Sequence, residues 1–167
     1  MNKAYLGIGT NIGDRTENLQ KAIDSLNLLP LTKVTAISNI YETDPVGYDE
    51  QGDFLNIAVE VETDLPAESL LGAALGIEAG IGRVRTVKNG PRVIDIDLLL
   101  YENEEYNNPT LTLPHPRMFE RGFVLIPLLD IDFQNSLFDR DIIKNSVVTD
   151  GVRLFAHKSA LNIQNKR

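Results

Sequence analysis

The sequence predicts one α+β domain, because hydrophobic patterns of period two and of helical period alternate along its 167 residues. The predicted elements follow the order β-α-β-β-α-β, in which two neighbouring strands have no helix between them. This order favours a ferredoxin-like core over a doubly wound parallel sheet, so we expect a mostly antiparallel sheet with helices packed on it. A chain of this length, 43% hydrophobic, can bury about two-thirds of its unfolded surface, and we expect a single domain over 1–167.

The first predicted strand covers residues 3–9, where apolar residues alternate with tyrosine and glycine, and it ends in the glycine-rich turn 9–13. This turn lacks the Lys-Ser or Lys-Thr ending of a P-loop, so we interpret it as structural. Asp14 is expected to cap the first helix, because Glu17 stands three residues later as in a capping box. The apolar residues of that helix follow at helical spacing: Leu19, Ala22, Ile23 and Leu26.

The middle of the chain predicts two strands and a second helix. Residues 32–43 predict one strand, and 44–53 a polar loop that serves either as a mobile lid or as an ordinary connection. The strand that begins at Phe54 has an unbroken apolar face, formed by Leu55, Ile57, Val59 and Val61. The second helix is predicted from Pro66, a residue favoured at the first helical position, towards Gly80.

Patterns are weaker in the last third of the chain. Pro116 favours the start of a helix, which would place Arg117 and Arg121 one turn apart. The apolar run 123–129 is expected to continue as a helix that packs on the sheet. The polar tail 151–167 carries no clear motif, and we assign it no role.

Composition argues against several classes of function. The chain has no cysteine, which excludes disulfides, thiolate zinc sites and cysteine nucleophiles. Its formal net charge of −8 argues against nucleic-acid binding, which usually needs a basic face. No stretch approaches about eighteen apolar residues, so we expect no membrane segment and a cytoplasmic protein. The sequence does not determine the oligomeric state, and a monomer is compatible with it.

The most informative stretch joins a cationic cluster to a strand with two carboxylates. The cluster consists of Arg83, Arg85, Lys88 and Arg92. It indicates either a site for a polyanion or simply a solvated loop. On the strand that follows, Asp95 and Asp97 share one face and lie roughly 7 Å apart. The opposite face is apolar and is expected to consist of Ile94, Ile96, Leu98 and Leu100.

Asp95 and Asp97 form a candidate site for two magnesium ions. Two carboxylates on a rigid strand can bind two cations about 3.5–4 Å apart, the separation used to hold a transferring phosphoryl group. Magnesium needs only one or two carboxylates, because waters and phosphate oxygens fill its other positions. The alternative is a half-buried strand whose polar face meets water.

Phe54 and Asn56 share one face of their strand. An aromatic ring beside an amide suits the stacking and edge recognition of a flat heterocycle. An exposed phenylalanine next to a polar residue gives the same pattern in a sequence, so both interpretations stay open here.

Several motifs together resemble one enzyme family. The run Gly90-Pro91-Arg92-Val93-Ile94-Asp95-Ile96-Asp97-Leu98-Leu99 resembles the signature of 6-hydroxymethyl-7,8-dihydropterin pyrophosphokinase, an enzyme of folate biosynthesis. Further matches lie, in order, at 6–14, 41–47, 54–56, 82–85, 114–118 and 121–123. The resemblance implies transfer of the β,γ-pyrophosphoryl group of ATP to the hydroxymethyl oxygen of the pterin, with release of AMP.

The resemblance also implies which residues bind ATP and metal. Asp95 and Asp97 would hold two Mg²⁺ ions, and the catalytic residues would be Arg83, Arg92 and Asp97. The expected ATP-binding residues are Glu78, Arg83, Arg85, Arg92, His115 and Arg121.

By the same resemblance, 6-hydroxymethyl-7,8-dihydropterin would lie between the rings of Phe54 and Phe123. Asn56 would bind its edge, and the pocket would be completed by Thr43 and the backbone of Pro45 and Val46. The loops 44–53 and 84–91 would close over both substrates.

Two other functions fit parts of the pattern. An Asp-X-Asp strand also occurs in metal-dependent nucleases, but the acidic balance and the lack of further clustered carboxylates argue against this function. A non-catalytic ferredoxin-like domain that binds a ligand would leave Asp95, Asp97 and Arg92 without a joint task. ATP, the pterin and two Mg²⁺ ions are therefore the expected ligands.

Overall fold

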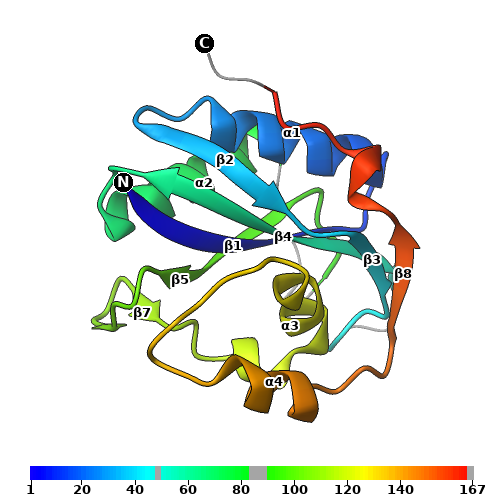
Figure 1. Ribbon diagram of the computed structural model, residues 1–167. Helices are drawn as coiled ribbons and strands as arrows, with labels where there is room; N and C mark the ends of the chain where they lie inside the picture. The colour runs from blue at the N-terminus through cyan, green and yellow to red at the C-terminus, as the bar shows by residue number, and fades with distance from the viewer. Residues whose placement is uncertain (48–49, 83–89, 165–167) are drawn as a thin grey trace.

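The computed structural model describes residues 1–47, 50–82 and 90–164. The main sheet has six strands in the order β5-β1-β4-β3-β8, and β2 also pairs with β4 (Figure 1). Every pairing among the described strands is antiparallel. The strands of this sheet are β1 (Asn2–Thr10), β2 (Thr32–Ile37), β3 (Ile40–Thr43), β4 (Phe54–Thr63), β5 (Asp95–Tyr101) and β8 (Val152–Ala156). The predicted α+β, ferredoxin-like arrangement is confirmed.

Helices cover both faces of the sheet. Figure 1 shows α1 (Arg15–Asn27) and α2 (Ala67–Ile81) on one side and α3 (Gly122–Leu129) on the other. The short elements are α4 (Arg140–Ser146), the 3₁₀ helices η1 (Met118–Glu120) and η2 (Lys158–Ala160), and the hairpin strands β6 (Tyr106–Asn107) and β7 (Thr112–Leu113). Within the described ranges, no helix is long and apolar enough to cross a membrane.

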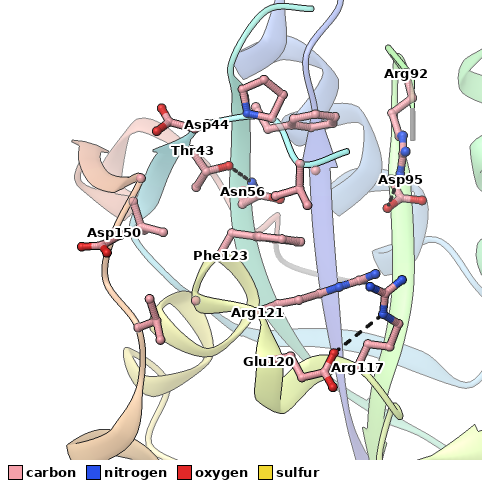
Figure 2. A pocket seen from close by; sticks show the side chains of 18 residues that line it. Thr43, Asp44, Asn56, Arg92, Asp95, Arg117, Glu120, Arg121, Phe123 and Asp150 are labelled. Carbon is pink, nitrogen blue, oxygen red and sulfur yellow. Dashed lines mark hydrogen bonds and ion pairs between the residues drawn. The ribbon is translucent and has the colours of Figure 1, made fainter. Parts of the chain in front are cut away.

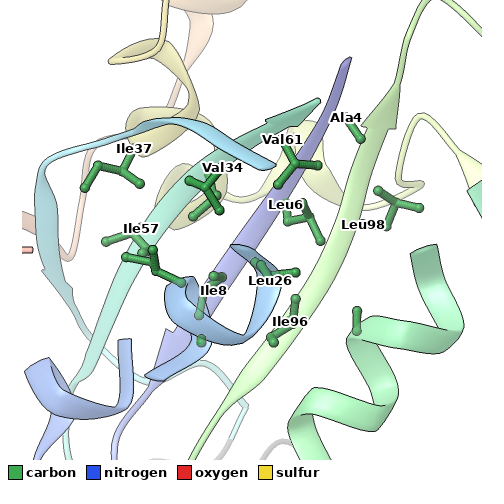
Figure 3. Packing of buried hydrophobic residues seen from close by; sticks show 14 of the residues in the cluster. Ala4, Leu6, Ile8, Leu26, Val34, Ile37, Ile57, Val61, Ile96 and Leu98 are labelled. Atoms are coloured by element: carbon green, nitrogen blue, oxygen red, sulfur yellow. The ribbon is translucent and has the colours of Figure 1, made fainter. Parts of the chain in front are cut away.

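The sheet separates two hydrophobic clusters. The cluster under α1 and α2 includes Leu26 and the predicted apolar face of β4, and Figure 3 shows Ile57 of that face close to Ile8 of β1. The cluster under α3 includes Tyr5, Ala58 and Leu99. Each large side chain that is fully buried contributes about 1.5–3 kcal/mol through burial, so both faces of β4 are anchored.

The two long helices begin close to their predicted positions. Oδ1 of Asp14 accepts a hydrogen bond from the backbone N–H of Glu17 at 3.0 Å, which confirms the predicted cap of α1. Pro66 was expected at the first helical position of α2, but its ψ of 154° is extended, and it is the N-cap residue instead. The helix therefore begins one residue later, at Ala67.

The prediction of one continuous strand over 32–43 is wrong, because Ser38 interrupts it. The backbone N–H of Ser38 donates to the carbonyl of Ala58, while its hydroxyl oxygen accepts from the backbone N–H of Ala58. The side chain thus takes a place that a backbone carbonyl would hold in the ladder. The segment consequently divides into β2 and β3, which pair with different parts of β4.

A bulge corrects a second prediction. The pairing of β1 with β5 shifts register between Tyr5 and Leu6, which face Leu100 and Leu98 respectively. The extra residue, Leu99, reverses the alternation of the strand from this point. Leu100 therefore packs in the cluster under α3, and not beside Leu98 as expected.

Two predictions near the C-terminus also need correction. Pro116 does not begin an α-helix: only the single turn η1 follows, because the extended backbone of Arg121 ends it and α3 begins at Gly122. The predicted helix at 123–129 is otherwise confirmed. The tail was assigned no role, but it supplies β8, which pairs with β3 at the edge of the sheet.

Replacing Ile57 by Ala is expected to lower the free energy of unfolding by about 2–5 kcal/mol, because a cavity would remain in a well-packed core. Ile57 is 1% exposed in the central strand β4. Urea denaturation measures the effect, and Leu75→Ala, at a 48% exposed position of α2, is the control. Equal losses in the two variants would show that Ile57 is not in the core.

Candidate functional site

The site is built over two glycines of the central strand β1. Gly9 pairs with Asn56 on one side and with Asp95 on the other, and Gly7 pairs with Asp97. Residues directly opposite each other in an antiparallel pair point to the same face, so the amide and both carboxylates share the face covered by α3. A Cβ on Gly9 would lie 2.6 Å from Oδ1 of Asn56, and only glycine leaves room for this amide.

A cavity of about 480 Å³ opens on this face (Figure 2). Its volume falls in the range of small-molecule sites. All of the residues expected to bind the pterin line it: Thr43, Pro45, Val46, Phe54, Asn56 and Phe123. Three charged residues expected at the phosphate and metal sites line the same cavity, namely Arg92, Asp95 and Arg121.

Asn56 and Thr43 form a buried polar pair at the wall of the cavity. Nδ2 of Asn56 donates to the hydroxyl oxygen of Thr43 at 2.7 Å, and these residues are only 8% and 2% exposed. This bond fixes the amide so that its Oδ1 faces Gly9. The pair presents a rigid hydrogen-bonding edge to a ligand in the cavity.

Each of the two cavity phenylalanines is paired with an arginine. The guanidinium carbon of Arg92 lies 5.7 Å from the ring centroid of Phe54, and that of Arg121 lies 5.6 Å from the ring centroid of Phe123. Cation–π attraction stabilises this arrangement. The aromatic part of the cavity therefore borders directly on its cationic part.

The carboxylates of β5 lie next to these cations. Nη1 of Arg92 is 3.2 Å from Oδ2 of Asp95. Burial, followed by the charge of Asp95, raises the pKa of Asp97 to about 7, and the charge of Arg121 acts in the opposite direction. Two carboxylates held together in a half-buried place repel each other, and a cation bound between them would remove this repulsion.

The donor set fits magnesium. In the part of the chain that the structure describes, no group of three or more His, Asp or Glu side chains is arranged to bind a metal ion. Asp95 and Asp97 would therefore supply only part of a coordination shell, which suits Mg²⁺, an ion that takes its remaining ligands from phosphates and water.

Two residues of the expected ATP site, Glu78 and His115, lie beside the cavity. Glu78 is buried, and its charge contributes to the raised pKa of Asp97, so it lies within electrostatic reach of the carboxylates. Burial and the charge of Arg121 lower the pKa of His115 below 6.5. Nδ1 of His115 accepts from the backbone N–H of Arg117 at 3.2 Å, so the neutral ring carries its proton on Nε2 and can donate it to a ligand.

Some of the predicted site residues do not line the cavity, and others lie outside the described residues. Asp97, Glu78 and His115 adjoin the cavity and do not line it. Arg83 and Arg85 lie outside the described residues. The same holds for 48–49 of the predicted loop 44–53 and for 84–89 of the predicted loop 84–91. Several residues that line the cavity were not predicted from the sequence: Gly9, Asp44, Arg117, Glu120, Gly122, Val148 and 150–152. For Gly9 a signal exists, since Gly7 and Gly9 alternate with apolar residues on one strand.

The raised pKa of Asp97 predicts a dependence of stability on pH. In the folded protein Asp97 keeps a proton that it loses in the unfolded chain near its ordinary pKa of 3.8. The protonated Asp97 therefore stabilises the fold fully below about pH 4, and this stabilisation is lost as the pH rises through about 7. Asp97→Asn should become more stable relative to the unsubstituted protein as the pH rises from about 4 to about 7, and the difference should then stay constant. Urea titrations without divalent ions test this, with the exposed Asp64→Asn as control. Parallel pH profiles for the Asp97→Asn and unsubstituted proteins would contradict it.

Solved structures show the same fold. A crystal structure of HPPK-DHPS in complex with substrates superimposes with a TM-score of 0.68 over 87% of this chain, at 18% identity. A crystal structure of the wild-type HPPK-DHPS of Plasmodium falciparum superimposes with a TM-score of 0.64 at 15% identity. This chain covers 43% and 47% of those longer chains. At such identities the likeness concerns the fold alone.

Sequence comparisons identify the family. The 7,8-dihydro-6-hydroxymethylpterin-pyrophosphokinase model matches residues 5–133. A 2-amino-4-hydroxy-6-hydroxymethyldihydropteridine pyrophosphokinase of Bacillus subtilis is 43% identical over 96% of this chain and 95% of its own length. A protein of the same name from Methylorubrum extorquens is 47% identical over 78% of this chain and 83% of its own. The chain belongs to the 7,8-dihydro-6-hydroxymethylpterin-pyrophosphokinase family.

Proposed function

We propose that this protein transfers the β,γ-pyrophosphoryl group of ATP to the hydroxymethyl oxygen of 6-hydroxymethyl-7,8-dihydropterin and releases AMP. Membership of the family supports an ATP-dependent pyrophosphokinase of folate biosynthesis. The observation that carries the proposal is that one cavity joins an aromatic slot to Arg92, Asp95 and Arg121. The reaction needs this juxtaposition, because a planar ring must bring its alcohol to a phosphorus atom. One domain, 1–167, would carry the whole activity.

The pterin would occupy the aromatic part of the cavity. Phe54 and Phe123 offer ring faces for stacking, and the buried pair of Asn56 and Thr43 offers a hydrogen-bonding edge. Pro45 and the exposed Val46 close one side of this slot. A site that hydrogen-bonds the edge of the ring rejects analogues without those groups, because its own polar atoms would then lose their partners.

The triphosphate would lie over β5. When bound by Asp95 and Asp97, two Mg²⁺ ions would neutralise the negative charge of the phosphate oxygens. Arg92 and Arg121 line the same cavity, and their guanidinium groups can bind phosphate with two parallel hydrogen bonds. His115 would donate from Nε2, and Glu78 would border the site from α2. Arg83 and Arg85 would add to the cationic site on the strength of the family resemblance alone.

Catalysis would rest on positioning and charge. ATP brings about four negative charges that repel an approaching oxygen, and phosphoryl-group transfer needs little covalent work from the protein. Asp97 holds its carboxylate rigidly because it lies within β5, and Arg92 is anchored to Asp95. Charge neutralisation at fixed positions is therefore what this chain contributes to the reaction.

We also propose that the protein acts in the cytoplasm. The formal net charge of −8 supports the absence of a nucleic-acid partner. ATP and the pterin are then its only expected partners, with no association with membranes.

Incubation with ATP, Mg²⁺ and 6-hydroxymethyl-7,8-dihydropterin should yield AMP and a diphosphorylated pterin, which chromatography separates. Asp97→Ala should abolish turnover while the circular dichroism spectrum stays unchanged, because the variant loses a metal ligand. Asp64→Ala, on the exposed surface, should remain active. Formation of ADP, no nucleotide turnover by the unsubstituted protein, or a fully active Asp97→Ala protein would each refute the assignment.

Phe123→Ala should weaken pterin binding by roughly 5- to 100-fold, as expected for the loss of one stacked ring. The dissociation constant of the pterin can be measured by fluorescence in the presence of a non-hydrolysable ATP analogue. Leu154→Ala is the control, because Leu154 is 64% exposed on β8 and does not line the cavity. The same affinity in the Phe123→Ala and unsubstituted proteins would exclude the stacking role.

A further inference from the structure

The C-terminal segment 148–152 forms part of the cavity wall. Val148, Asp150, Gly151 and Val152 line the cavity together with Thr43 and Phe123. Figure 2 shows Asp150 and Asp44 on the side of the cavity opposite Arg92 and Asp95. The segment lies beyond residue 133, where the family match ends. The segment 148–152 thus forms the end of the cavity that lies away from Arg92 and Asp95.

Two glycines allow this segment to pack closely against the site. A Cβ on Gly122 would lie 2.0 Å from the carbonyl oxygen of Val148, so the backbone of Val148 rests directly beside Gly122, the residue before Phe123. Gly151 has a φ of +72°, and a Cβ there would lie 2.8 Å from Oδ2 of Asp44. The backbone N–H of Asp44 also donates to the carbonyl of Gly151 at 2.9 Å.

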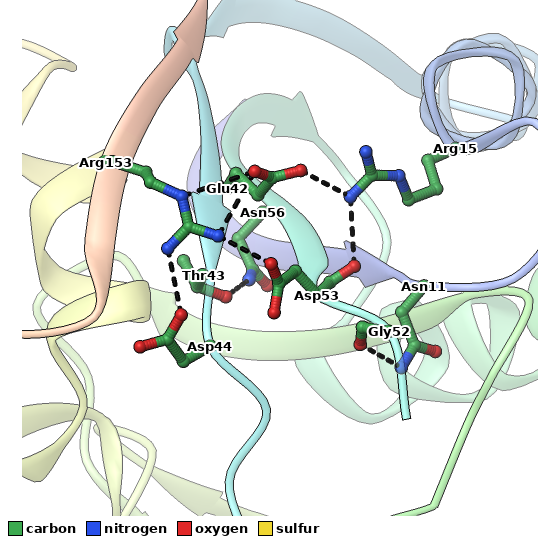
Figure 4. Close-up of polar contacts among 9 residues, drawn as sticks. All are labelled: Asn11, Arg15, Glu42, Thr43, Asp44, Gly52, Asp53, Asn56 and Arg153. Atoms are coloured by element: carbon green, nitrogen blue, oxygen red, sulfur yellow. Dashed lines mark hydrogen bonds and ion pairs between the residues drawn. The ribbon is translucent and has the colours of Figure 1, made fainter. Parts of the chain in front are cut away.

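Arg153 follows this segment and binds three carboxylates (Figure 4). Its Nη1 is 2.9 Å from Oδ1 of Asp44, and its Nη2 is 2.7 Å from Oδ2 of Asp53 and 3.2 Å from Oε1 of Glu42. Asp44 and Asp53 stand at the two ends of the connection between β3 and β4. One guanidinium thus holds both ends of the connection to which Pro45 and Val46 belong.

The arrangement depends on a planar group with several donors. Glu42, Asp44 and Asp53 would repel one another without a shared cation. Arg15 supports the cluster from α1, because its Nη1 lies 2.9 Å from Oε2 of Glu42 and 3.0 Å from the carbonyl oxygen of Asp53. Arginine can reach several carboxylates from fixed directions, whereas lysine acts as a point charge.

We propose that Arg153 is a positioning residue for the pterin: it ties Asp44 and Asp53 together and thereby holds Pro45, Val46 and Thr43 against the bound ring. This inference rests on the proposed function. The register supports it, since Arg153 pairs with Glu42 and Val152 pairs with Thr43 across β3 and β8. Arg153 touches neither substrate and acts through the connection that it holds.

If Arg153 served only the stability of the fold, its loss would lower the melting temperature. Exposed ion pairs contribute little to the stability of a fold, and the side chain of Arg153 is 45% exposed. Loss of Arg153 should therefore leave the melting temperature almost unchanged and alter pterin binding selectively. Because the pterin is uncharged, its binding should also weaken with added salt only where these ion pairs are present.

The test compares Arg153→Ala, Arg153→Lys and Asp44→Asn with the unsubstituted protein. Lys33→Ala is the matched control, because it removes another exposed ion pair of the same sheet, that with Glu62. For each protein the measurements are kcat, KM for the pterin at saturating ATP, KM for ATP, and the melting temperature. The pterin measurements are repeated at low and high salt.

Arg153→Ala and Asp44→Asn should raise KM for the pterin about five- to tenfold, with kcat, KM for ATP and melting temperature close to those of the unsubstituted protein. Arg153→Lys should recover part of the loss, and high salt should raise KM for the pterin only in proteins that keep Arg153 and Asp44. The inference is overturned if KM for the pterin is unchanged in Arg153→Ala, or if kcat and the melting temperature fall while both KM values rise. Failure of the proposed function would appear differently, as an unsubstituted protein that makes no AMP.

Discussion

The site depends on the position of β1 between β4 and β5. Because Gly9 faces Asn56 on one neighbour and Asp95 on the other, a single row across the sheet joins the amide to the carboxylate. The missing side chain in the middle of this row creates the hollow into which both groups point. Any side chain at Gly9 would displace the amide of Asn56, so the geometry of binding is already contained in the pairing of three strands.

The same sheet assigns different tasks to its two faces. One face is mainly apolar and packs under α1 and α2, where burial provides stability. The other face is apolar only where α3 covers it, and it becomes polar towards Asp95 and Asn56. Groups that are costly to bury therefore gather where a ligand can satisfy them, while the opposite face keeps the strands in register.

Sequence reasoning succeeds where the signal is local and periodic. The alternation along β5 placed Asp95 and Asp97 on one face, and that along β4 placed Asn56 on the opposite side from Ile57. The cap at Asp14 was equally readable, because it depends on residues within one turn. These local rules, with the family resemblance, predicted the fold class and the residues that line the core of the cavity.

What sequence reasoning missed depends on contacts between distant segments. The break at Ser38 arises from its bonds to Ala58, twenty residues away, and periodicity carries no trace of them. The contacts of the tail were missed for the same reason. Arg153 binds carboxylates that lie 100 to 111 residues away in the sequence, namely Glu42, Asp44 and Asp53. Such pairings become visible only when the strand order is known.

The break at Ser38 divides the long strand β4 between two partners. Residues 59–63 pair with β2, far from the cavity, whereas 54–56 pair with β3 beside it. Substitutions in the first of these stretches can tune the robustness of the scaffold, and substitutions in the second can tune recognition of the ring, with little interference between the two. A single continuous strand in place of β2 and β3 would have coupled these properties, so the interrupting serine gives the protein two separately adjustable halves.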